Sequence, residues 1–497
     1  SGRSPERHVH DSNSIRSTSM ESWDVVVVGG GPAALRAAIA SADTGSSPLM
    51  IDSYGIGAAS GGAPTAGLAA SIEEIDSSAH LEDTVAAGGE SVNQEVASRI
   101  CSQAVSTLAE LERWGLVLRR TEAGLPHASD VPGHSRPRVT GCGDSTLREV
   151  TRILEEQAIK RSIPRRTDIV PISLVMDNRQ VRGIVGFDLM SGEVVSIQAK
   201  AVILATEGHQ GMWSNPSQGS GAGAAMAAQA GVRLAGMAHT PRHALTMKGT
   251  DLKLPFDLLG SGGRLRREDG EDVGPEAVLD GEQCVLDLRF LDSEAGVWFA
   301  QTSRRVKDRS GLDISLDVIP LSSAVANTTG GAPVDEHGRV TFDNGKMWFT
   351  GLYAAGRSAH TGMHGSGLLP GNILLEDLVG GDSAGSHAGE WASHASFASS
   401  SSIEAAAQAA ENQIDNLASD SGDSVSRVST SLTSIMSAVN GSRDETSLAK
   451  AAEELSNLRE SGMTLTDKSR VMNTELATAL RLQGMLSLAE SIVGMED

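Results

Sequence analysis

The amino-acid sequence predicts an α/β fold with a Rossmann-like domain, an inserted α+β domain and a C-terminal helical domain. Near the N-terminus, four consecutive valines at 25–28 precede a glycine turn and an alanine-rich run of helical composition. Apolar strand patterns recur at 201–205 and 348–356, and the segment from about 235 to 329 is irregular and rich in arginine. A serine-rich linker at 396–402 then leads into alanine-rich helical segments. We therefore expect an α/β unit interrupted by an insertion and followed by a helical unit.

The first strand–turn–helix unit has the spacing of a dinucleotide-binding turn. Gly29, Gly31 and Ala34 fit the pattern G-x-G-x-x-A. In that pattern the first glycine allows the turn, the second lets the backbone approach a pyrophosphate, and the alanine lets the helix pack close to the strand. The start of the helix, with Pro32 and Ala33, supplies oriented N–H groups and a partial positive charge. The unit predicts binding of an adenine dinucleotide; an ordinary turn without a ligand is the alternative.

A second apolar run at 49–51 ends in Asp52, where an acid is expected to meet a ribose hydroxyl about 20 residues beyond the turn. Further along, apolar side chains at helical spacing predict one helix from Ser91 to Trp114 and another over about 145–159. Near the C-terminus, an apolar helical stripe is interpreted as the core of a bundle; it consists of Leu476, Leu480, Met485, Leu488 and Ile492.

Composition excludes several classes of partner. The net charge of −22 argues against nucleic acid or an anionic membrane as the main partner. No run reaches the ~18 apolar residues of a transmembrane helix, so direct membrane insertion is not expected. Three cysteines without a C-x-x-C pair exclude a disulfide scaffold and an internal iron–sulfur ligand set, and they fit a reduced, cytoplasmic setting. Residues 1–19 are polar and are expected to be a disordered leader before Met20.

Four segments together carry a family resemblance. They are the dinucleotide turn, A-V-I-L-A-T-E-G at 201–208, G-L-Y-A-A-G at 351–356 with the later segment 364–375, and D-K-S-R-V-M-N-T-E-L at 467–476 with the helix after it. In these segments the chain resembles the flavoprotein subunit of succinate dehydrogenase and fumarate reductase, a family that includes L-aspartate oxidase. The resemblance spans about residues 23–493.

This resemblance implies an architecture and a reaction. It implies a leader at 1–19, an FAD-binding domain at 20–235 and 330–395, a capping domain at 236–329 and a C-terminal helical domain at 403–497. It also implies hydride transfer between the flavin and the C2–C3 bond of a dicarboxylate held by arginine and histidine, with electrons passing to an iron–sulfur subunit. The expected location is the cytoplasm, or the inner face of the membrane through partner subunits.

On the cofactor side, the resemblance carries over well. Ser60 aligns with the histidine that links FAD covalently in the family, so non-covalent FAD is expected. Two positions depart from the family: Ala222 stands at the aspartate of T-G-D-G, and Arg357 replaces the glutamate after G-L-Y-A-A-G. Besides the turn residues, Ser60 and Arg357, the predicted cofactor contacts are Asp52, Ser53, Gly67, Thr206, Gly356, Asn372, Ile373 and Leu374.

On the substrate side, His243 falls on the substrate histidine of the family, and with Arg242 and His364 it forms the predicted catalytic set. Most other positions differ. Pro255-Phe256 stands where the family has Thr-Glu, and the capping segment with the catalytic arginine is absent. The remaining departures are Ala326 for histidine and Leu368 for arginine.

These departures leave several functions open. Arg264, Arg266 and Arg267, together with Arg242, could form a new anion clamp, or they could be solvated charges that balance nearby acids. The first hypothesis is a divergent FAD oxidoreductase acting on a small carboxylate or another substrate. The second is a non-catalytic homologue that serves as an assembly or interaction subunit. A third is an enzyme similar to aspartate oxidase, suggested by the missing histidine at Ser60.

Overall fold

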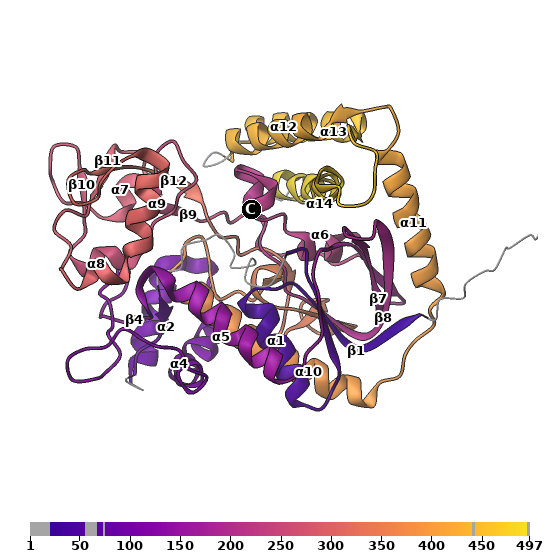
Figure 1. Cartoon of the computed structure of the whole chain (residues 1–497), viewed down its shortest axis with the longest axis horizontal. Helices are drawn as coiled ribbons and strands as arrows, with labels where there is room; N and C mark the ends of the chain where they lie inside the picture. The colour runs from indigo at the N-terminus through magenta and orange to yellow at the C-terminus, as the bar shows by residue number, and fades with distance from the viewer. Residues whose placement is uncertain (1–19, 55–66, 73–74, 440–442, 495–497) are drawn as a thin grey trace, which may run out of the picture.

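The computed structural model describes residues 20–54, 67–72, 75–439 and 443–494. Ser60 and the expected leader lie outside these ranges. Figure 1 shows a central sheet with helices, a separate sheet-and-helix unit on one side, and a group of C-terminal helices above. The α/β fold predicted from the sequence is confirmed.

The main sheet has the strand order β14-β15-β7-β8-β1-β2-β5 in the described part of the chain, with β6 paired to β7. Strands β2 and β8 flank β1 in parallel, and the valines at 25–28 are at most 1% exposed, which explains their unbroken apolar run. The strand bounds are β1 Glu21–Val28, β2 Pro48–Ile51, β5 Arg165–Arg166, β6 Ile169–Asp177, β7 Gln180–Asp188, β8 Glu193–Leu204, β14 Arg339–Phe342 and β15 Met347–Ala354.

Two helices lie against each other on one face of this sheet, α1 (Pro32–Asp43) and α10 (Asn372–His394). Gly381, Gly385 and Gly389 form a stripe on α10, and a Cβ atom added at Gly385 would lie 2.1 Å from the carbonyl oxygen of Ala37. The Ser41 hydroxyl donates a hydrogen bond of 2.9 Å to the Gly385 carbonyl. The absence of side chains on this stripe therefore fixes how α1 and α10 sit relative to each other.

The other helices of this part are α2 (Asp76–Gly88), α5 (Thr146–Lys160) and α6 (Ala222–Gln229). The predicted single helix from Ser91 to Trp114 is wrong: α3 (Gln94–Cys101) and α4 (Ala104–Arg113) are separate helices. The Ser102 hydroxyl donates a 2.7 Å hydrogen bond to the carbonyl of Arg99. Such a local bond competes with the helical ladder and accompanies the break.

A second sheet, with the order β10-β11-β12-β9 within the described residues, has its own apolar core. Leu245, Leu258, Leu286 and Phe299 are buried in that core. The elements are β9 Arg242–Met247, β10 Arg264–Arg267, α7 Pro275–Leu279, β11 Cys284–Asp287, α8 Ala295–Trp298, α9 Ala300–Ser310 and β12 Ile319–Val325. We call this unit the cap; the predicted domain boundaries remain predictions.

Of the C-terminal helices, α14 packs onto α6, and α11 packs onto strands β6, β7 and β8 of the main sheet. The C-terminal helices are α11 (Ser401–Leu417), α12 (Val425–Ala438), α13 (Glu445–Ser461) and α14 (Thr474–Gly494). The apolar stripe of α14 is at most 8% exposed, which agrees with its interpretation as core. Among the described residues, no helix has both the length and the apolar character needed to cross a membrane. Short paired strands complete the fold: β3 Leu68–Ala69, β4 Val139–Thr140, β13 Ala332–Pro333, β16 Ala359–His360, β17 Asp423–Ser424 and β18 Met463–Thr464.

The contact between α1 and α10 predicts opposite effects for two glycine substitutions on one helix. Gly385→Ala should lower the free energy of unfolding by about 1–3 kcal/mol, because the new methyl group meets the α1 backbone. Gly380→Ala should be neutral or stabilising by up to about 1 kcal/mol, because its methyl would meet only Ala355 Cβ, at 4.0 Å. Urea unfolding of both variants checks this, and equal midpoints would contradict the close packing.

Candidate functional site

The turn after β1 brings the ends of three strands together. Gly29 has a φ of +132°, and a Cβ there would lie 2.0 Å from the carbonyl oxygen of Ala205 at the end of β8. A Cβ at Gly30 would lie 2.0 Å from Oδ2 of Asp52, just beyond β2. A side chain at either position would therefore overlap atoms at the ends of β8 or β2.

Two helix N-termini next to this turn lack side-chain caps from the described residues. The N-cap residues are Gly31 for α1 and Gly371 for α10, and neither helix start has a side-chain acceptor among those residues. The first N–H groups of each helix can therefore bind an acceptor group of a ligand, aided by the helix dipole. Ala33 in α1 lies against Gly381, which is nine residues into α10. Because Ala33 is one residue into α1, the start of α10 extends about 12 Å beyond the start of α1 along the helix axis, at 1.5 Å per residue.

Asp52, the predicted ribose contact, forms an ion pair with Arg165 at 2.7 Å, and Arg165 also contacts Glu155 at 3.2 Å. Burial raises the pKa of Asp52 above its usual value, and Arg165 opposes that effect. The pair orients the carboxylate at the end of β2, directly beside Gly30.

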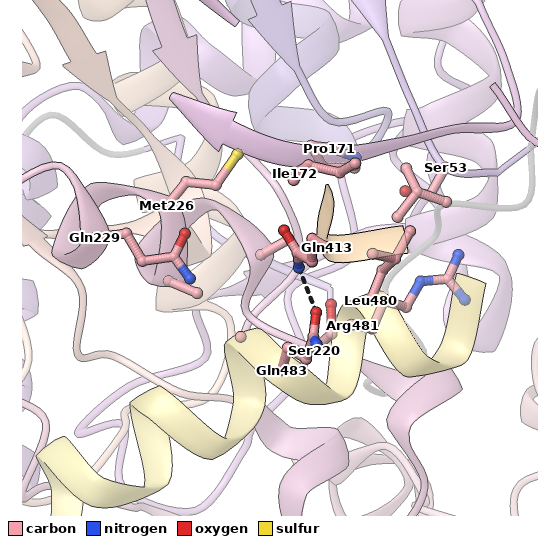
Figure 2. A pocket seen from close by; sticks show the side chains of 14 residues that line it. Ser53, Pro171, Ile172, Ser220, Met226, Gln229, Gln413, Leu480, Arg481 and Gln483 are labelled. Atoms are coloured by element: carbon pink, nitrogen blue, oxygen red, sulfur yellow. Dashed lines mark hydrogen bonds between the residues drawn. The ribbon is translucent and has the colours of Figure 1, made fainter. Parts of the chain in front are cut away.

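A pocket opens beside this carboxylate, between β6, α6 and α14 (Figure 2). Ser53 lines one side, and Arg481 and Gln483 of α14 line the opposite side. Gln413 of α11 donates a hydrogen bond to Gln483. Ala222 of α6, where the resemblance expects an aspartate, also lines the pocket. Because Gln413, Arg481 and Gln483 belong to α11 and α14, the C-terminal helices help to enclose the space next to the predicted ribose contact.

Thr206 joins the end of β8 to two other segments. Its hydroxyl accepts a 2.8 Å hydrogen bond from the backbone N–H of Gly223 in α6 and lies 3.1 Å from the Ser358 hydroxyl. Ser358 Oγ also accepts from the Thr206 N–H at 3.0 Å. Gly67 lies against β4, because a Cβ there would be 2.0 Å from the Thr140 carbonyl oxygen. These contacts shape the site, which is a role the sequence pattern alone did not show.

Arg357 lies in a buried charged cluster at the first turns of α10. Its guanidinium contacts Glu376 and Asp377, the latter at 2.9 Å, and donates to the carbonyl of Thr328 at 3.0 Å. His364 Nε2 lies 2.8 Å from Glu376. Burial alone would raise the pKa of Glu376, but His364 and Arg357 hold that pKa well below its usual range. The cluster therefore brings the predicted residues Arg357 and His364 together, with a carboxylate that stays ionised between them.

Asn372, the first residue of α10, is held by two side chains that the sequence analysis missed. His80 Nε2 donates a 2.7 Å hydrogen bond to Asn372 Oδ1, and Asn372 Nδ2 donates a 2.9 Å hydrogen bond to Thr84 Oγ1. All three residues are buried, and burial lowers the pKa of His80 to about 4. The i, i+4 spacing of His80 and Thr84 places them on one face of α2, and that spacing could have indicated a shared partner. Of the neighbouring predicted contacts, Leu374 is buried and Ile373 is partly buried.

A third missed residue, Arg138, lies close to this contact. Its side chain is 0% exposed. The guanidinium donates hydrogen bonds through Nε and Nη2 to Asp76 and through Nη1 to Asp83. The same Nη1 lies 2.7 Å from Nδ1 of His134, whose Nε2 donates to the Pro370 carbonyl at 2.8 Å. Two carboxylates compensate the buried guanidinium, and the network ties α2 to the loop before α10.

His243 lies on β9 of the cap, close to apolar side chains. Its Nε2 donates a 2.7 Å hydrogen bond to the carbonyl of Leu254, and its ring packs edge-on against Phe256 with 4.7 Å between the ring centroids. Burial lowers the pKa of His243 to about 4, so the imidazole is neutral near pH 7. Phe256 in turn packs against the buried side chains of Val131 and Val139.

The other predicted cations do not gather around His243. Arg242 is exposed, alternates with His243 along the strand, and donates to the carbonyl of Ser323 at 3.2 Å. The three arginines of β10 pair with acids of the cap: Arg264 with Asp272, Arg266 with Asp287 and Asp272, and Arg267 with Glu271 and Glu282. This arrangement favours charge balance within the cap over a new anion clamp.

A buried acid lies beside Phe256. Asp257 is 4% exposed, and its Oδ1 has no hydrogen-bond partner among the described residues. Burial raises the pKa of Asp257 to about 7, and Asp144 adds to the effect while Arg119 opposes it. Arg119 Nη1 donates to Ser261 Oγ at 3.3 Å, which connects the cap to the segment before β4.

Comparison with known proteins places this geometry in a family. A family model described as an FAD binding domain matches residues 24–374, and one described as the fumarate reductase flavoprotein C-term matches residues 430–495. The chain belongs to the fumarate reductase/succinate dehydrogenase flavoprotein family. It is therefore an FAD-dependent oxidoreductase by family, and the predicted FAD cofactor is confirmed.

Individual relatives agree with this assignment. The fumarate reductase flavoprotein subunit of Mycobacterium tuberculosis is 28% identical over 95% of this chain and 89% of its own length. An L-aspartate oxidase of Yersinia pestis is 30% identical over 74% of this chain and 75% of its own. The structure of an E. coli quinol fumarate reductase variant superposes with a TM-score of 0.86 at 23% identity, over 95% of this chain and 89% of that one.

The buried acid of the cap predicts a pH-dependent stability. Because the folded-state pKa of Asp257 lies above its usual 3.8, the folded chain binds more protons than the unfolded chain between pH 4 and 7. The contribution of Asp257 to the free energy of unfolding should therefore fall as the pH rises through that window. Asp257→Asn should match the wild type near pH 4 and exceed it at pH 8 by up to about 4 kcal/mol. Unfolding at both pH values measures this, and an equal difference at pH 4 and 8 would contradict it.

Proposed function

We propose that this chain is an FAD-dependent oxidoreductase that transfers a hydride between the flavin and a carbon–carbon bond next to a carboxylate. The observation that carries the proposal is the pair of helix N-termini of α1 and α10, offset by about 12 Å along the helix axis and without side-chain caps from the described residues. A diphosphate at one end and the pyrimidine edge of a flavin at the other, separated by a ribityl chain, fit this spacing.

The residues present fit FAD at three points. The N–H groups that follow Gly31 would hold the diphosphate, because a helix start favours negative charge. Asp52, oriented by Arg165, would accept hydrogen bonds from the ribose hydroxyls. We place the adenosine end on the side where Ser53 and Ala222 line the pocket of Figure 2.

The start of α10 would hold the pyrimidine end of the ring. Backbone N–H groups of Ile373 and Leu374 lie in its first turn, and the hydrogen bonds of Asn372 to His80 and Thr84 fix that turn. When bound, FAD accepts or returns a hydride, while the second hydrogen of the substrate bond leaves or arrives as a proton. The helix dipole would stabilise the negative charge that reduction adds to this end of the ring.

The cap would cover the substrate, with His243 as the polar group nearest the reacting bond in this proposal. Its Nε2–H is committed to the Leu254 carbonyl, so Nδ1 remains as a hydrogen-bond acceptor on a neutral ring. A carboxylate ion has no hydrogen to donate to Nδ1, so the fixed, neutral imidazole would orient the substrate by packing contact. His364, bound to Glu376, would support the cofactor side instead of contacting substrate. Arg242 has no role at the reacting bond in this arrangement, because it is exposed.

We also propose an iron–sulfur protein as the electron partner, supported by relatives that are named flavoprotein subunits. Through such a partner the chain would sit in the cytoplasm or at the inner face of a membrane. Reoxidation of the reduced protein by a soluble iron–sulfur protein, but not by oxygen at a similar rate, would support this partner.

The attachment of FAD is tested by acid precipitation of the purified protein. Serine at position 60 cannot form the histidyl bond to flavin, so all flavin should appear in the supernatant after the protein is precipitated with trichloroacetic acid. Absorbance of the supernatant and pellet measures the two fractions. Flavin that stays in the pellet would contradict non-covalent binding.

The proposed reaction is tested with a histidine variant. His243→Leu should lower kcat/KM for reoxidation of the dithionite-reduced protein by an unsaturated carboxylate by about 10–100-fold, because the fixed ring that would position the substrate by contact is lost. The ratio of flavin to protein should stay unchanged. His337→Gln is a matched control, because that histidine is exposed on another part of the molecule. Equal losses in both variants, or no carboxylate that reoxidises the flavin, would contradict the proposal.

A further inference from the structure

We infer that the C-terminal helices α11 and α14 form the adenine end of the cofactor site, and that the side-chain amides of Gln413 and Gln483 bind the edge of the adenine base. This inference rests on the proposed function, which places the adenosine end of FAD beside Ser53 and Ala222. It gives the C-terminal helices a part in holding the cofactor, in addition to their packing against the main sheet.

The pocket of Figure 2 begins one residue beyond the proposed ribose contact. Ser53 follows Asp52 directly and lines the pocket, and its hydroxyl donates a 3.2 Å hydrogen bond to the carbonyl of Ile169 at the start of β6. The next residues of β6, 170–172, line the same pocket. Because adenine is bonded directly to its ribose, a ribose held at Asp52 would bring the base to this pocket.

Helix α14 forms one wall of the pocket and contacts two of the other walls. The guanidinium carbon of Arg481 lies 5.2 Å from the ring centroid of Tyr54, the residue after Ser53. One turn further along α14, a Cβ atom added at Gly484 would lie 3.1 Å from the Cβ of Ala225 in α6. Arg481, Gly484 and Ala225 all line the pocket, so these contacts fix the distance between its walls.

The lining suits the faces of a flat, uncharged ring. Apolar side chains make up much of it, among them Pro171, Ile172, Met226 and Leu480. Of the described residues that line the pocket, Arg481 is the only one with a charged side chain. A guanidinium plane stacks favourably on an aromatic ring, so this charge is compatible with a base.

The polar side chains of the pocket are partly engaged with the protein itself. The Ser220 hydroxyl donates a 2.9 Å hydrogen bond to Glu207, and the Ser53 hydroxyl is engaged at β6. Gln413 Nε2 donates a hydrogen bond to Gln483 Oε1, which joins α11 to α14 (Figure 2). The other amide atoms, Oε1 of Gln413 and Nε2 of Gln483, have no further partner among the described residues. They remain as one acceptor and one donor.

An acceptor and a donor held side by side match the edge of adenine. The adenine amino group donates hydrogen bonds, and the ring nitrogens near it accept them, which is the pattern that glutamine amides bind. The amino group would donate to Gln413 Oε1, and N1 or N7 would accept from Gln483 Nε2. Gln229 of α6 also lines the pocket but is exposed, whereas Gln413 and Gln483 are partly buried. The two partly buried amides are therefore assigned to the base.

Contacts to the adenosine end matter because the flavin is expected to be held without a covalent bond. Ser60 stands where the resemblance expects the histidine that forms this bond. A base bound between β6 and α14 would add binding energy at the end of FAD that takes no part in the reaction. It would also link cofactor binding to the packing of α14 on the rest of the molecule.

The test measures dissociation constants of the full-length protein, stripped of its flavin, for FAD and for the analogue in which purine replaces adenine. The analogue lacks only the amino group, so the wild type should bind it about tenfold more weakly than FAD. Gln413→Met should weaken FAD binding about tenfold and bring the two constants to within about a factor of two, because the acceptor for the amino group is lost. Gln408→Met, at an exposed position of the same helix, is the matched control and should leave both constants unchanged.

Gln483→Met should weaken the binding of both compounds about tenfold and keep the preference for FAD, because N1 and N7 are present in both. If the amide pair served only to join α11 to α14, the wild type would bind FAD and the purine analogue equally, and Gln413→Met would change both constants by the same factor. Either result would overturn the inference. The wild-type preference is measured without any variant, so it does not depend on whether a variant folds.

This test is separate from that of the proposed reaction. If no carboxylate reoxidises the reduced flavin while the preference for FAD is observed, the reaction is contradicted and the inference stands. Equal binding of FAD and the analogue, with reoxidation by a carboxylate intact, would contradict the inference alone.

Discussion

The contact between α1 and α10 is the constraint on which the rest of the site depends. Three glycines on α10 let the backbone of α1 approach so closely that a methyl group at Gly385 would meet a carbonyl oxygen at 2.1 Å. Because the two helices are parallel and in fixed register, their N-termini are also fixed. In the proposed site, the dinucleotide turn at Gly29 would set one end of the ligand, and the start of α10 would set the other. Both proposed anchors are backbone groups, so they do not depend on the side chains at Ala222 and Arg357, where the chain departs from the family.

A buried cluster of charged side chains lies at the start of α10. Arg357 introduces a buried positive charge, and Asp377 lies 2.9 Å away to balance it, while Glu376 joins Arg357 to His364. An unpaired guanidinium at this depth would destabilise the fold by several kcal/mol. The carboxylates of Glu376 and Asp377 therefore compensate the buried charge of Arg357. In the cap, the three arginines of β10 pair with acids of the cap itself. His243 lies among apolar neighbours.

The sequence contains more signals for the cofactor half of the site than for the substrate half, for a physical reason. A glycine turn, a following acid and an uncapped helix are local patterns, so Gly29, Gly31 and Asp52 could be recognised in order along the chain. The clamp on Asn372 could not, because His80 and Thr84 are distant from it in sequence and meet it only through the packing of α2 on α10. The helix expected from Ser91 to Trp114 was wrong for a local reason, since apolar spacing continues through the break while the hydroxyl of Ser102 bonds back to the chain. The pairing of Arg264 and its neighbours also depends on strand register, which composition does not show. The domain boundaries and the roles of individual site residues remain predictions.

The central claim is that two uncapped helix N-termini, held apart by the packing of α1 on α10, bind the two ends of the flavin half of FAD. A crystal structure of the FAD-bound protein tests this claim most directly. We expect diphosphate oxygens within hydrogen-bonding distance of the N–H groups after Gly31, and a pyrimidine carbonyl within the same distance of the N–H groups after Asn372. A flavin ring bound away from the start of α10, with the diphosphate still at α1, would contradict the account.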